Sequence, residues 1–150
     1  MRFEIAADTD RGIVKETNQD SLLVKCFSTC KGDMAFAVLC DGMGGLSGGE
    51  RASALAAQGM TQHLLENAQA TDISTEMGRA ALRLNEKVKD IRDSENRKIE
   101  AGTTLTAVFI RNGELCGCGS GDSHIYLYRA GEVRQLNIDH NFGMHLDQMV

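Results

Sequence analysis

Hydrophobic residues recur with two different spacings along this chain. In its first part, alternating or continuous apolar residues predict three short strands, at residues 3–7, 21–27 and 34–40. Apolar residues then recur at intervals of three and four, which predicts amphipathic helices over residues 52–64 and 77–91. Asp72 or Ser74 can cap the second helix, because both side chains carry an oxygen that accepts from a free backbone N–H group.

The last part of the chain returns to the spacing of strands. Residues 103–111 are rich in β-branched residues, and Asn112-Gly113 is the dipeptide that most strongly favours a two-residue hairpin turn. We expect another hairpin from residues 124–129 and 133–136, with its turn at Ala130-Gly131. Strands followed by helices and again by strands indicate an α+β fold, not the βαβ alternation of a parallel sheet. We therefore expect an antiparallel β-sandwich flanked by helices.

Composition and charge restrict the class of protein. The 150 residues suffice for one domain with a real core, and 42% hydrophobic with 25% charged residues is typical of a globular protein. The net charge of −5 argues against binding to nucleic acid or to a membrane surface. Glu4 stands where a secretory signal would be apolar, and no apolar stretch has the length of a bilayer. We expect a cytoplasmic protein.

Asp41 is the first candidate for chemistry, because it ends an apolar run and begins a glycine cluster. Residues 35–40 are all apolar, and Gly42, Gly44 and Gly45 follow the carboxylate. A charge at the end of a buried strand must be paired with a donor or a cation. Glycines allow the backbone to approach whatever the carboxylate holds. Hard divalent cations prefer carboxylate and carbonyl oxygens, so a metal ion is the natural partner.

Other interpretations of the glycine cluster are weaker. A dinucleotide-binding fingerprint that begins at Gly42 would need glycine in place of Ser47. A P-loop that ends at Gly49 would need lysine in place of Glu50. The alternative that stays open is a tight turn that leads into the following helix.

Further polar groups stand where strands are expected to begin or end, at residues 15–20, 102–104 and 121–123. Each alone is consistent with a turn, because Asp and Asn are common in turns. In this order, and together with residues 9–12, 41–45 and 49–53, they resemble the metal-dependent protein phosphatases, the type 2C serine/threonine phosphatases. The resemblance is closest to the bacterial members and extends over essentially the whole chain.

The resemblance implies a site for two Mn²⁺ or Mg²⁺ ions, with a third, weaker site. Asp41 would bridge the two ions, and the backbone carbonyl of Gly42 would bind one of them. Gln19 would hold a metal-bound water, and Asp20 would act in the coordination shell or just behind it. Asp122 would help to hold the third ion.

The same resemblance implies hydrolysis of phosphoserine and phosphothreonine in proteins by a metal-bridging water. Lys15 stands where the family usually has the arginine that grips the substrate phosphate, and with Asp41 and Asp20 it forms the expected catalytic group. A lysine attracts phosphate without the two parallel hydrogen bonds of a guanidinium, so substrate binding should be weaker. No cysteine nucleophile is needed, so Cys40 is interpreted as a packing residue. The expected partners are phosphoproteins and a cognate serine/threonine kinase.

The family domain also contains later metal-binding aspartates, one in a second Asp-Gly and one in an Asp-Asn. Asp41-Gly42 is the only Asp-Gly in this chain, and Asp139 and Asp147 stand too early to replace the later ligands. We therefore interpret residues 1–150 as the N-terminal portion of a phosphatase domain, without the C-terminal strands and ligands. Fewer ligands lower metal affinity, and open sheet edges favour self-association.

Two alternative functions stay open. Lys15, the missing aspartates and His124, which stands where the family usually has arginine, are compatible with a catalytically impaired interaction or regulatory module. The other alternative is a metal-dependent hydrolase of small phosphate esters.

Overall fold

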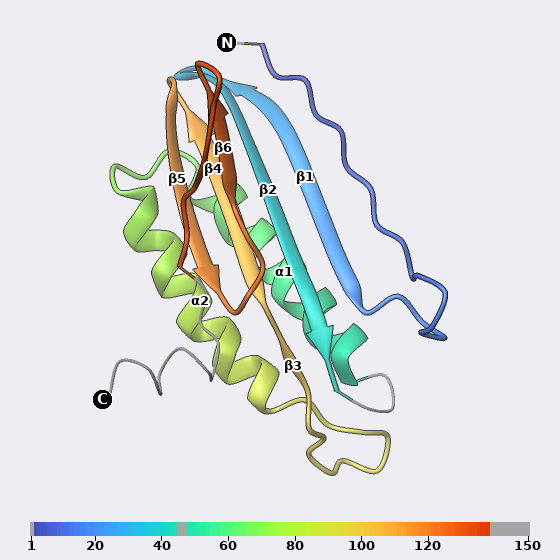
Figure 1. Ribbon diagram of the computed structural model, residues 1–150. Coiled ribbons are helices and arrows are strands. Elements are labelled where there is room, and N and C mark those ends of the chain that lie inside the picture. The colour runs from blue at the N-terminus through green and yellow to red at the C-terminus, as the bar shows by residue number, and fades with distance from the viewer. Residues whose placement is uncertain (1, 45–47, 139–150) are drawn as a thin grey trace, which may run out of the picture.

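The computed structural model describes residues 2–44 and 48–138 (Figure 1). Two long strands, β1 (Asp20–Thr29) and β2 (Gly32–Met43), come first, followed by helices α1 (Gly48–Glu66) and α2 (Ile73–Lys89). Five shorter strands complete this order, namely β3 (Gly102–Thr103), β4 (Leu105–Arg111), β5 (Glu114–Ser120), β6 (Tyr126–Arg129) and β7 (Glu132–Gln135). Neither helix in this part of the chain is long and apolar enough to cross a membrane.

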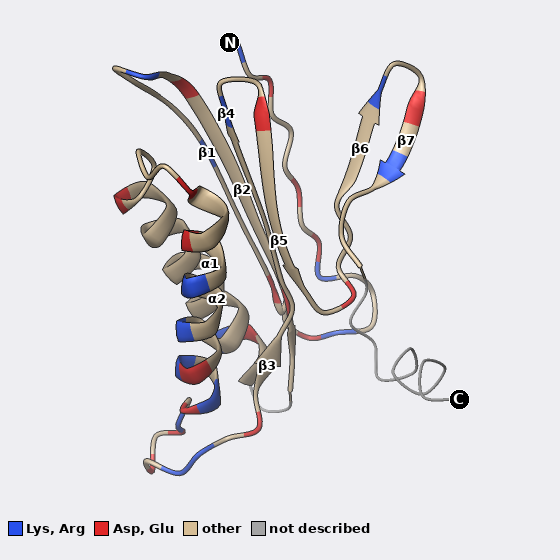
Figure 2. Cartoon of the chain, turned by 90° about the vertical axis from the view of Figure 1, so that its left-hand side faces the viewer, with Lys and Arg blue, Asp and Glu red and all other residues tan. Residues whose placement is uncertain are grey.

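All strand pairs in the described residues are antiparallel. The main sheet has the order β1-β2-β4-β5, with β3 paired to the end of β2, and β6 and β7 form a second, two-stranded sheet. Figure 2 shows both helices on one face of the main sheet and the β6–β7 hairpin on the opposite side. The α+β fold class is therefore confirmed, and the strand ends that carry the polar groups meet at one end of the main sheet.

The core lies between the main sheet and the two helices. Side chains of β2 alternate between the two faces of the sheet, so that Phe36, Val38 and Cys40 point towards the helices and are fully buried. Met60 of α1 and Met77 of α2 pack into the same cluster. Each such side chain contributes about 2 kcal/mol by leaving water, which keeps the β2 strand rigid up to its polar end.

The predicted cap of the second helix and the two predicted hairpin turns are confirmed. The Asp72 side chain accepts from the backbone N–H of Thr75 at 3.0 Å, so Asp72 is the cap of α2. Asn112 and Gly113 have φ of 53° and 81°, as a hairpin turn with two left-handed residues requires. Ala130, with φ of 54°, forms the corresponding turn between β6 and β7.

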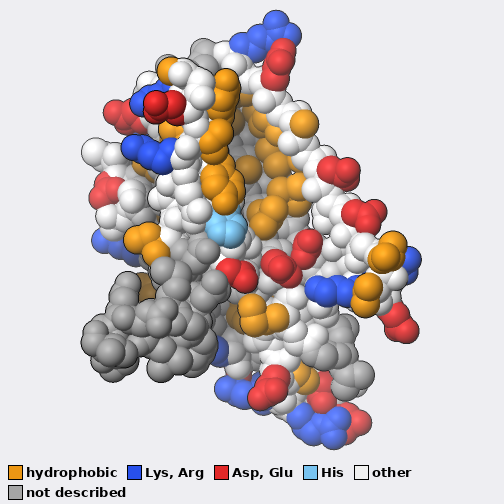
Figure 3. Space-filling model, in the orientation of Figure 1, with side chains coloured by type: hydrophobic (Ala, Val, Ile, Leu, Met, Phe, Trp, Pro, Cys, Tyr) orange, Lys and Arg blue, Asp and Glu red, His pale blue; other side chains and the backbone are white. Residues whose placement is uncertain are grey.

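The expected strand at residues 3–7 is wrong. The structure assigns no strand to residues 2–19, and Phe3 and Ile5 instead border a cavity of about 390 Å³ together with Leu22 of β1 and Leu39 of β2. Alternation indicates one apolar side, but a strand also needs a neighbour for its backbone hydrogen bonds. Figure 3 views this face of the main sheet, where hydrophobic side chains line a hollow with acidic side chains at its lower end.

Candidate functional site

Asp20 and Asp41 face each other across the first two strands. The β1–β2 register makes them direct partners, with Asp20 at the start of β1 and Asp41 close to the end of β2. Our expectation of an interior carboxylate at position 41 is wrong, because Asp41 is exposed. Val38 and Cys40 point into the core, and the alternation of the strand turns the side chains of Leu39 and Asp41 to the other face.

A cavity of about 280 Å³ brings the expected catalytic residues together. Lys15, Gln19, Asp20 and Asp41 all border it, together with residues 10–14 and Asn18. The side-chain amide of Gln19 donates to the backbone carbonyl of Gly44 at 3.1 Å, which leaves the amide oxygen of Gln19 as an acceptor. The cavity therefore combines carboxylate and amide oxygens with the ammonium group of Lys15 and the guanidinium group of Arg11.

Negative charge accumulates around Asp41. Partial loss of hydration raises the pKa of the Asp41 carboxyl, and the charge of Asp20 and a hydrogen bond with its carboxyl raise the pKa further. The charge of Asp122 also raises the pKa of Asp41, whereas Lys15 lowers it. Asp41 remains exposed, so the loss of hydration is partial. The ammonium group of Lys15 therefore opposes the carboxyl groups of Asp20, Asp41 and Asp122. A bound cation would relieve this excess of negative charge.

The residues present fit a hard divalent cation, although they do not enclose it. Within residues 2–44 and 48–138, no three acidic, histidine or cysteine side chains form a complete metal cluster. Mg²⁺ typically keeps several waters and needs only one or two protein carboxylates. Asp41 and Asp20, with the carbonyl of Gly42 and water, form a donor set of that kind.

Gly42 holds the end of β2 close to its neighbours. Its backbone N–H donates to the carbonyl of Gln19 at 3.1 Å, next to the start of α1. A Cβ atom at Gly42 would lie 2.1 Å from the carbonyl oxygen of Gly49 and 2.6 Å from that of Gln19. The close approach that glycine allows here is to backbone of this chain, and the approach of the Gly42 backbone to a metal ion stays a prediction. Gly44 has φ of 137°, which suits the alternative of a tight turn, and Gly45 lies outside the described residues.

Thr104 joins Asp41 to the turn that carries Asp122. The backbone N–H of Asp41 donates to Oγ1 of Thr104 at 2.9 Å, so the Thr104 hydroxyl is free to donate to Oγ of Ser123 at 2.8 Å. The N–H of Thr104 in turn donates to the carbonyl of Asp41 at 2.9 Å. Gly121 has φ of 103°, and a Cβ there would lie 2.7 Å from Cγ2 of Thr104. These contacts explain why the expected continuous strand at residues 103–111 is broken at Thr104.

Sequence reasoning missed two residues at this site. Asn137 donates to the carbonyl of Ser123 at 2.8 Å and accepts from the N–H of Ile125 at 2.7 Å, which braces the turn beside Asp122. No sequence pattern marked Asn137. Arg11 borders the same cavity as Lys15. Its position within residues 9–12, four residues before Lys15, was a signal that could have marked it as a second basic residue of the site.

Cys40 is a packing residue, as expected. Its side chain is fully buried, and burial raises the pKa of the Cys40 thiol to about 12, although a hydrogen bond with Thr103 acts in the opposite direction. The thiol is therefore protonated near neutral pH and cannot act as a nucleophile.

Substituting Thr104 should test the connection between the two acidic groups. Thr104→Val keeps the shape but removes the hydroxyl from a side chain that is 2% exposed, so the Asp41 N–H and the Ser123 hydroxyl lose their partner. We expect a loss of about 1–3 kcal/mol in the free energy of unfolding, measured with urea. Thr104→Ser should retain most of it. Equal stability of the Val variant and the wild type would show that the hydrogen bonds contribute nothing.

Comparison with known proteins gives consistent matches. The model of the protein phosphatase 2C family matches residues 11–148. The serine/threonine protein phosphatase PstP of Mycobacterium tuberculosis is 32% identical over 137 residues, which cover 91% of this chain and 25% of PstP. The serine/threonine phosphatase stp of Listeria welshimeri is 29% identical over 136 residues, which cover 89% of this chain and 53% of that protein.

The same similarity is found among solved structures. The catalytic domain of PstP in complex with two manganese ions superposes with a TM-score of 0.76 at 32% identity, over 96% of this chain and 59% of that chain. The chain thus spans about a quarter of the length of PstP and about half of the length of stp.

Proposed function

The chain belongs to the protein phosphatase 2C family, and from this membership we propose that it acts as a metal-dependent protein serine/threonine phosphatase. The observation that carries the proposal is the pair Asp20 and Asp41, which face each other beside a cavity that Lys15 and Gln19 also border. The negative charge of Asp20 and Asp41 favours a divalent cation, and the ammonium group of Lys15 favours a phosphate. A metal-dependent hydrolysis of a phosphate ester uses both.

Asp41 and Asp20 would hold two Mn²⁺ or Mg²⁺ ions, with help from the carbonyl of Gly42. When bound, such ions lower the pKa of a water molecule and stabilise charge on the phosphoryl oxygens. The free amide oxygen of Gln19 would orient a water molecule, since its amide nitrogen is held by Gly44. Asp122, whose charge acts on Asp41, would contribute to a third site. Thr104 positions the backbone of Asp41.

Substrate binding would rest on the two basic residues that border the cavity. Lys15 attracts the phosphate as a point charge, and Arg11 adds a guanidinium with the forked geometry that suits two phosphate oxygens. The proposed substrates are proteins that carry phosphoserine or phosphothreonine, and a serine/threonine kinase is the natural source of these groups. A cytoplasmic location and self-association through open sheet edges stay predictions.

A non-catalytic interaction module is the second candidate. The observation in its favour is that, among the described residues, no group of three or more potential ligands is assembled into a metal cluster. With weak metal affinity the same surface would bind a phosphorylated partner without hydrolysing the ester.

Metal binding and hydrolysis distinguish these candidates. We expect Mn²⁺ to bind saturably in calorimetry, and phosphopeptide hydrolysis to depend on Mn²⁺ and to stop in EDTA. We also expect a higher kcat/KM for a phosphopeptide than for p-nitrophenyl phosphate. Absence of binding at millimolar Mn²⁺ would favour the interaction module, and a higher kcat/KM for the small ester would favour a small-ester hydrolase.

A further inference from the structure

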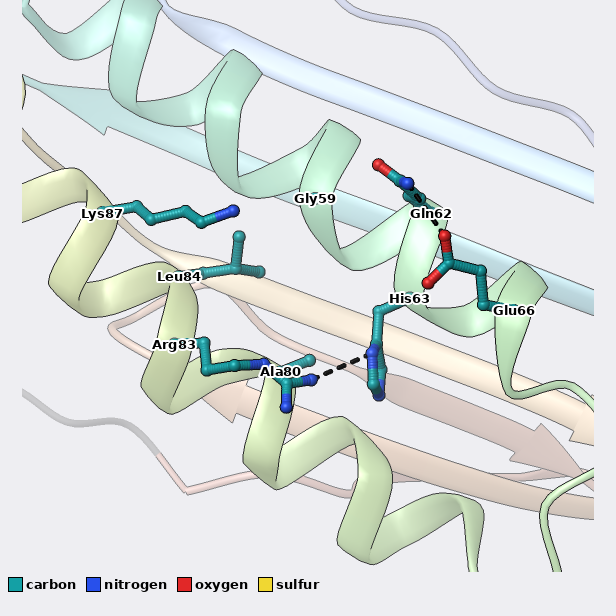
Figure 4. A pocket seen from close by; sticks show the side chains of 8 residues that line it. All are labelled: Gly59, Gln62, His63, Glu66, Ala80, Arg83, Leu84 and Lys87. Carbon is teal, nitrogen blue, oxygen red and sulfur yellow. Dashed lines mark hydrogen bonds between the residues drawn. The ribbon is translucent and has the colours of Figure 1, made fainter.

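A further cavity lies between the two helices, on the other side of the main sheet from Asp41 (Figure 2). Its volume is about 290 Å³, and residues of both α1 and α2 line it (Figure 4). Gly59 allows Leu84 of α2 to pack closely against α1, because a Cβ atom at residue 59 would lie 2.3 Å from Cδ2 of Leu84. His63, which lines the cavity, stands 15 residues after Gly48, the first residue of α1. At 1.5 Å per residue this is about 22 Å along the helix, so the cavity is remote from the candidate metal site.

His63 is held in one orientation by residues of α2. A guanidinium nitrogen of Arg83 lies 3.0 Å from Nδ1 of His63 (Figure 4). Arginine only donates, so the lone pair of Nδ1 is the acceptor in this contact. Nε2 lies 3.3 Å from a carboxylate oxygen of Glu76. The His63 side chain is only 13% exposed, so the three residues form a fixed bridge between the helices.

This bridge leaves the charge of Arg83 uncompensated. Arg79 and Lys89 of the same helix pair with Glu76 and Glu86 at 2.6 and 3.0 Å. In the part of the chain that the structure describes, no carboxylate lies within 4.0 Å of Arg83 or Lys87. The imidazole of His63 orients the guanidinium and supplies no negative charge, so the guanidinium stays available to an anion.

The remaining polar residues of the cavity are compatible with an anion. Lys87 follows Arg83 by four residues on α2, so both side chains lie on one face of the helix and line the same cavity. Glu66 is the one acidic residue in the lining, and its carboxylate accepts from the side-chain amide of Gln62 at 2.8 Å. Two positive charges and one negative charge leave a net positive cavity in a chain whose net charge is −5.

We propose that the cavity between α1 and α2 is a binding site for a phosphate group, held by Arg83 and Lys87. The guanidinium fork matches two phosphate oxygens, and the ammonium group adds a second charge against a dianion. The ligand is either free inorganic phosphate or the phosphoryl group of a modified side chain. The site does not depend on the proposed catalytic activity, because Asp20 and Asp41 do not take part in it.

Titration of the metal-free 150-residue chain with inorganic phosphate tests this site. In ¹H–¹⁵N NMR at constant pH and ionic strength in EDTA, we expect saturable shifts at residues 59–66 and 80–87. The double variant Arg83→Gln, Lys87→Gln should raise the Kd about tenfold or more, because two charge-assisted hydrogen bonds are lost. Lys89→Gln removes one positive charge from the same helix, as Lys87→Gln does, but Lys89 lies outside the cavity, so the Kd of this variant should equal that of the wild type.

Three results would overturn the proposal. The first is chemical shifts that do not saturate with phosphate. The second is a loss of affinity in Lys89→Gln equal to that in Lys87→Gln. The third is binding of acetate at the same residues with the same Kd as phosphate. A parallel titration with O-phosphoserine identifies the source of the ligand. Tighter binding of O-phosphoserine than of inorganic phosphate indicates a phosphorylated side chain. Weaker or equal binding indicates the free ion. Arg83 and Lys87 are exposed, and the unfolding temperature of each variant checks the fold. If the double variant is unstable, the single variant Lys87→Gln replaces it in the phosphate titration.

Discussion

Asp41→Asn should weaken the binding of Mn²⁺ by at least about 100-fold and reduce phosphopeptide hydrolysis to the rate without protein. The carboxamide has one oxygen acceptor in place of two and turns an NH₂ donor towards the cation. It also removes one of the negative charges that gather with Asp20 and Asp122 at this end of the main sheet. Calorimetric titration with Mn²⁺ and a phosphate-release assay measure the two effects.

The stability of the Asp41→Asn variant is the internal control. Because the pKa of Asp41 is raised in the folded state, first by loss of hydration and then by Asp20, the folded state disfavours the charged form. Ionisation of the Asp41 carboxyl therefore lowers the free energy of unfolding of the metal-free protein as the pH rises through the folded-state pKa of Asp41. Below the unfolded-state pKa the carboxyl is protonated in both states, and this destabilisation is absent. At neutral pH in EDTA the Asn variant should be at least as stable as the wild type.

A matched variant separates a local effect from a change in total charge. Asp33→Asn makes the same substitution at the opposite end of β2, where Asp33 accepts from the Ser28 hydroxyl at 2.7 Å. It should retain the Mn²⁺ affinity of the wild type. Wild-type Mn²⁺ affinity in Asp41→Asn would remove Asp41 from the ligand set, and with it the enzymatic interpretation of the site.

Gly42→Ala should lower the free energy of unfolding by about 3 kcal/mol or more. The added methyl group would lie 2.1 Å from the carbonyl oxygen of Gly49 and 2.6 Å from that of Gln19. Both neighbours are backbone atoms, so no side-chain rotation can make room, and the end of β2 must separate from α1 or from residue 19. Urea unfolding monitored by circular dichroism measures the loss.

Gly78→Ala is the control for this substitution. Gly78 lies within α2, and a Cβ atom there would have no atom within 4 Å. Alanine is the better helix former, so this variant should be more stable than the wild type by about 0.5–1 kcal/mol. A loss below about 1 kcal/mol in Gly42→Ala would mean that the strand end and the helix start move apart at little cost.

Local patterns were sufficient for the elements and for part of the site. Apolar spacing predicted α1 and α2, the Asn-Gly dipeptide predicted the turn at residues 112–113, and the side-chain oxygens of Asp72 and Ser74 predicted a cap, which the structure places at Asp72. Each of these features depends on residues within a few positions of one another. The order of the polar motifs was sufficient for the family, which the match over residues 11–148 confirms. It also selected Lys15, Gln19, Asp20 and Asp41, which border one cavity.

The tertiary structure alone decided the environment of these residues. The register between β1 and β2 places Asp20 opposite Asp41, and the alternation of β2 turns Asp41 out of the core. Thr104 binds Asp41 across 63 positions of the chain, and Arg83 binds His63 across 20. Contacts of this separation form only when distant segments pack together, so no local spacing encodes them. The amino-acid sequence by itself therefore determined which groups are available for chemistry, and packing decided which of them meet.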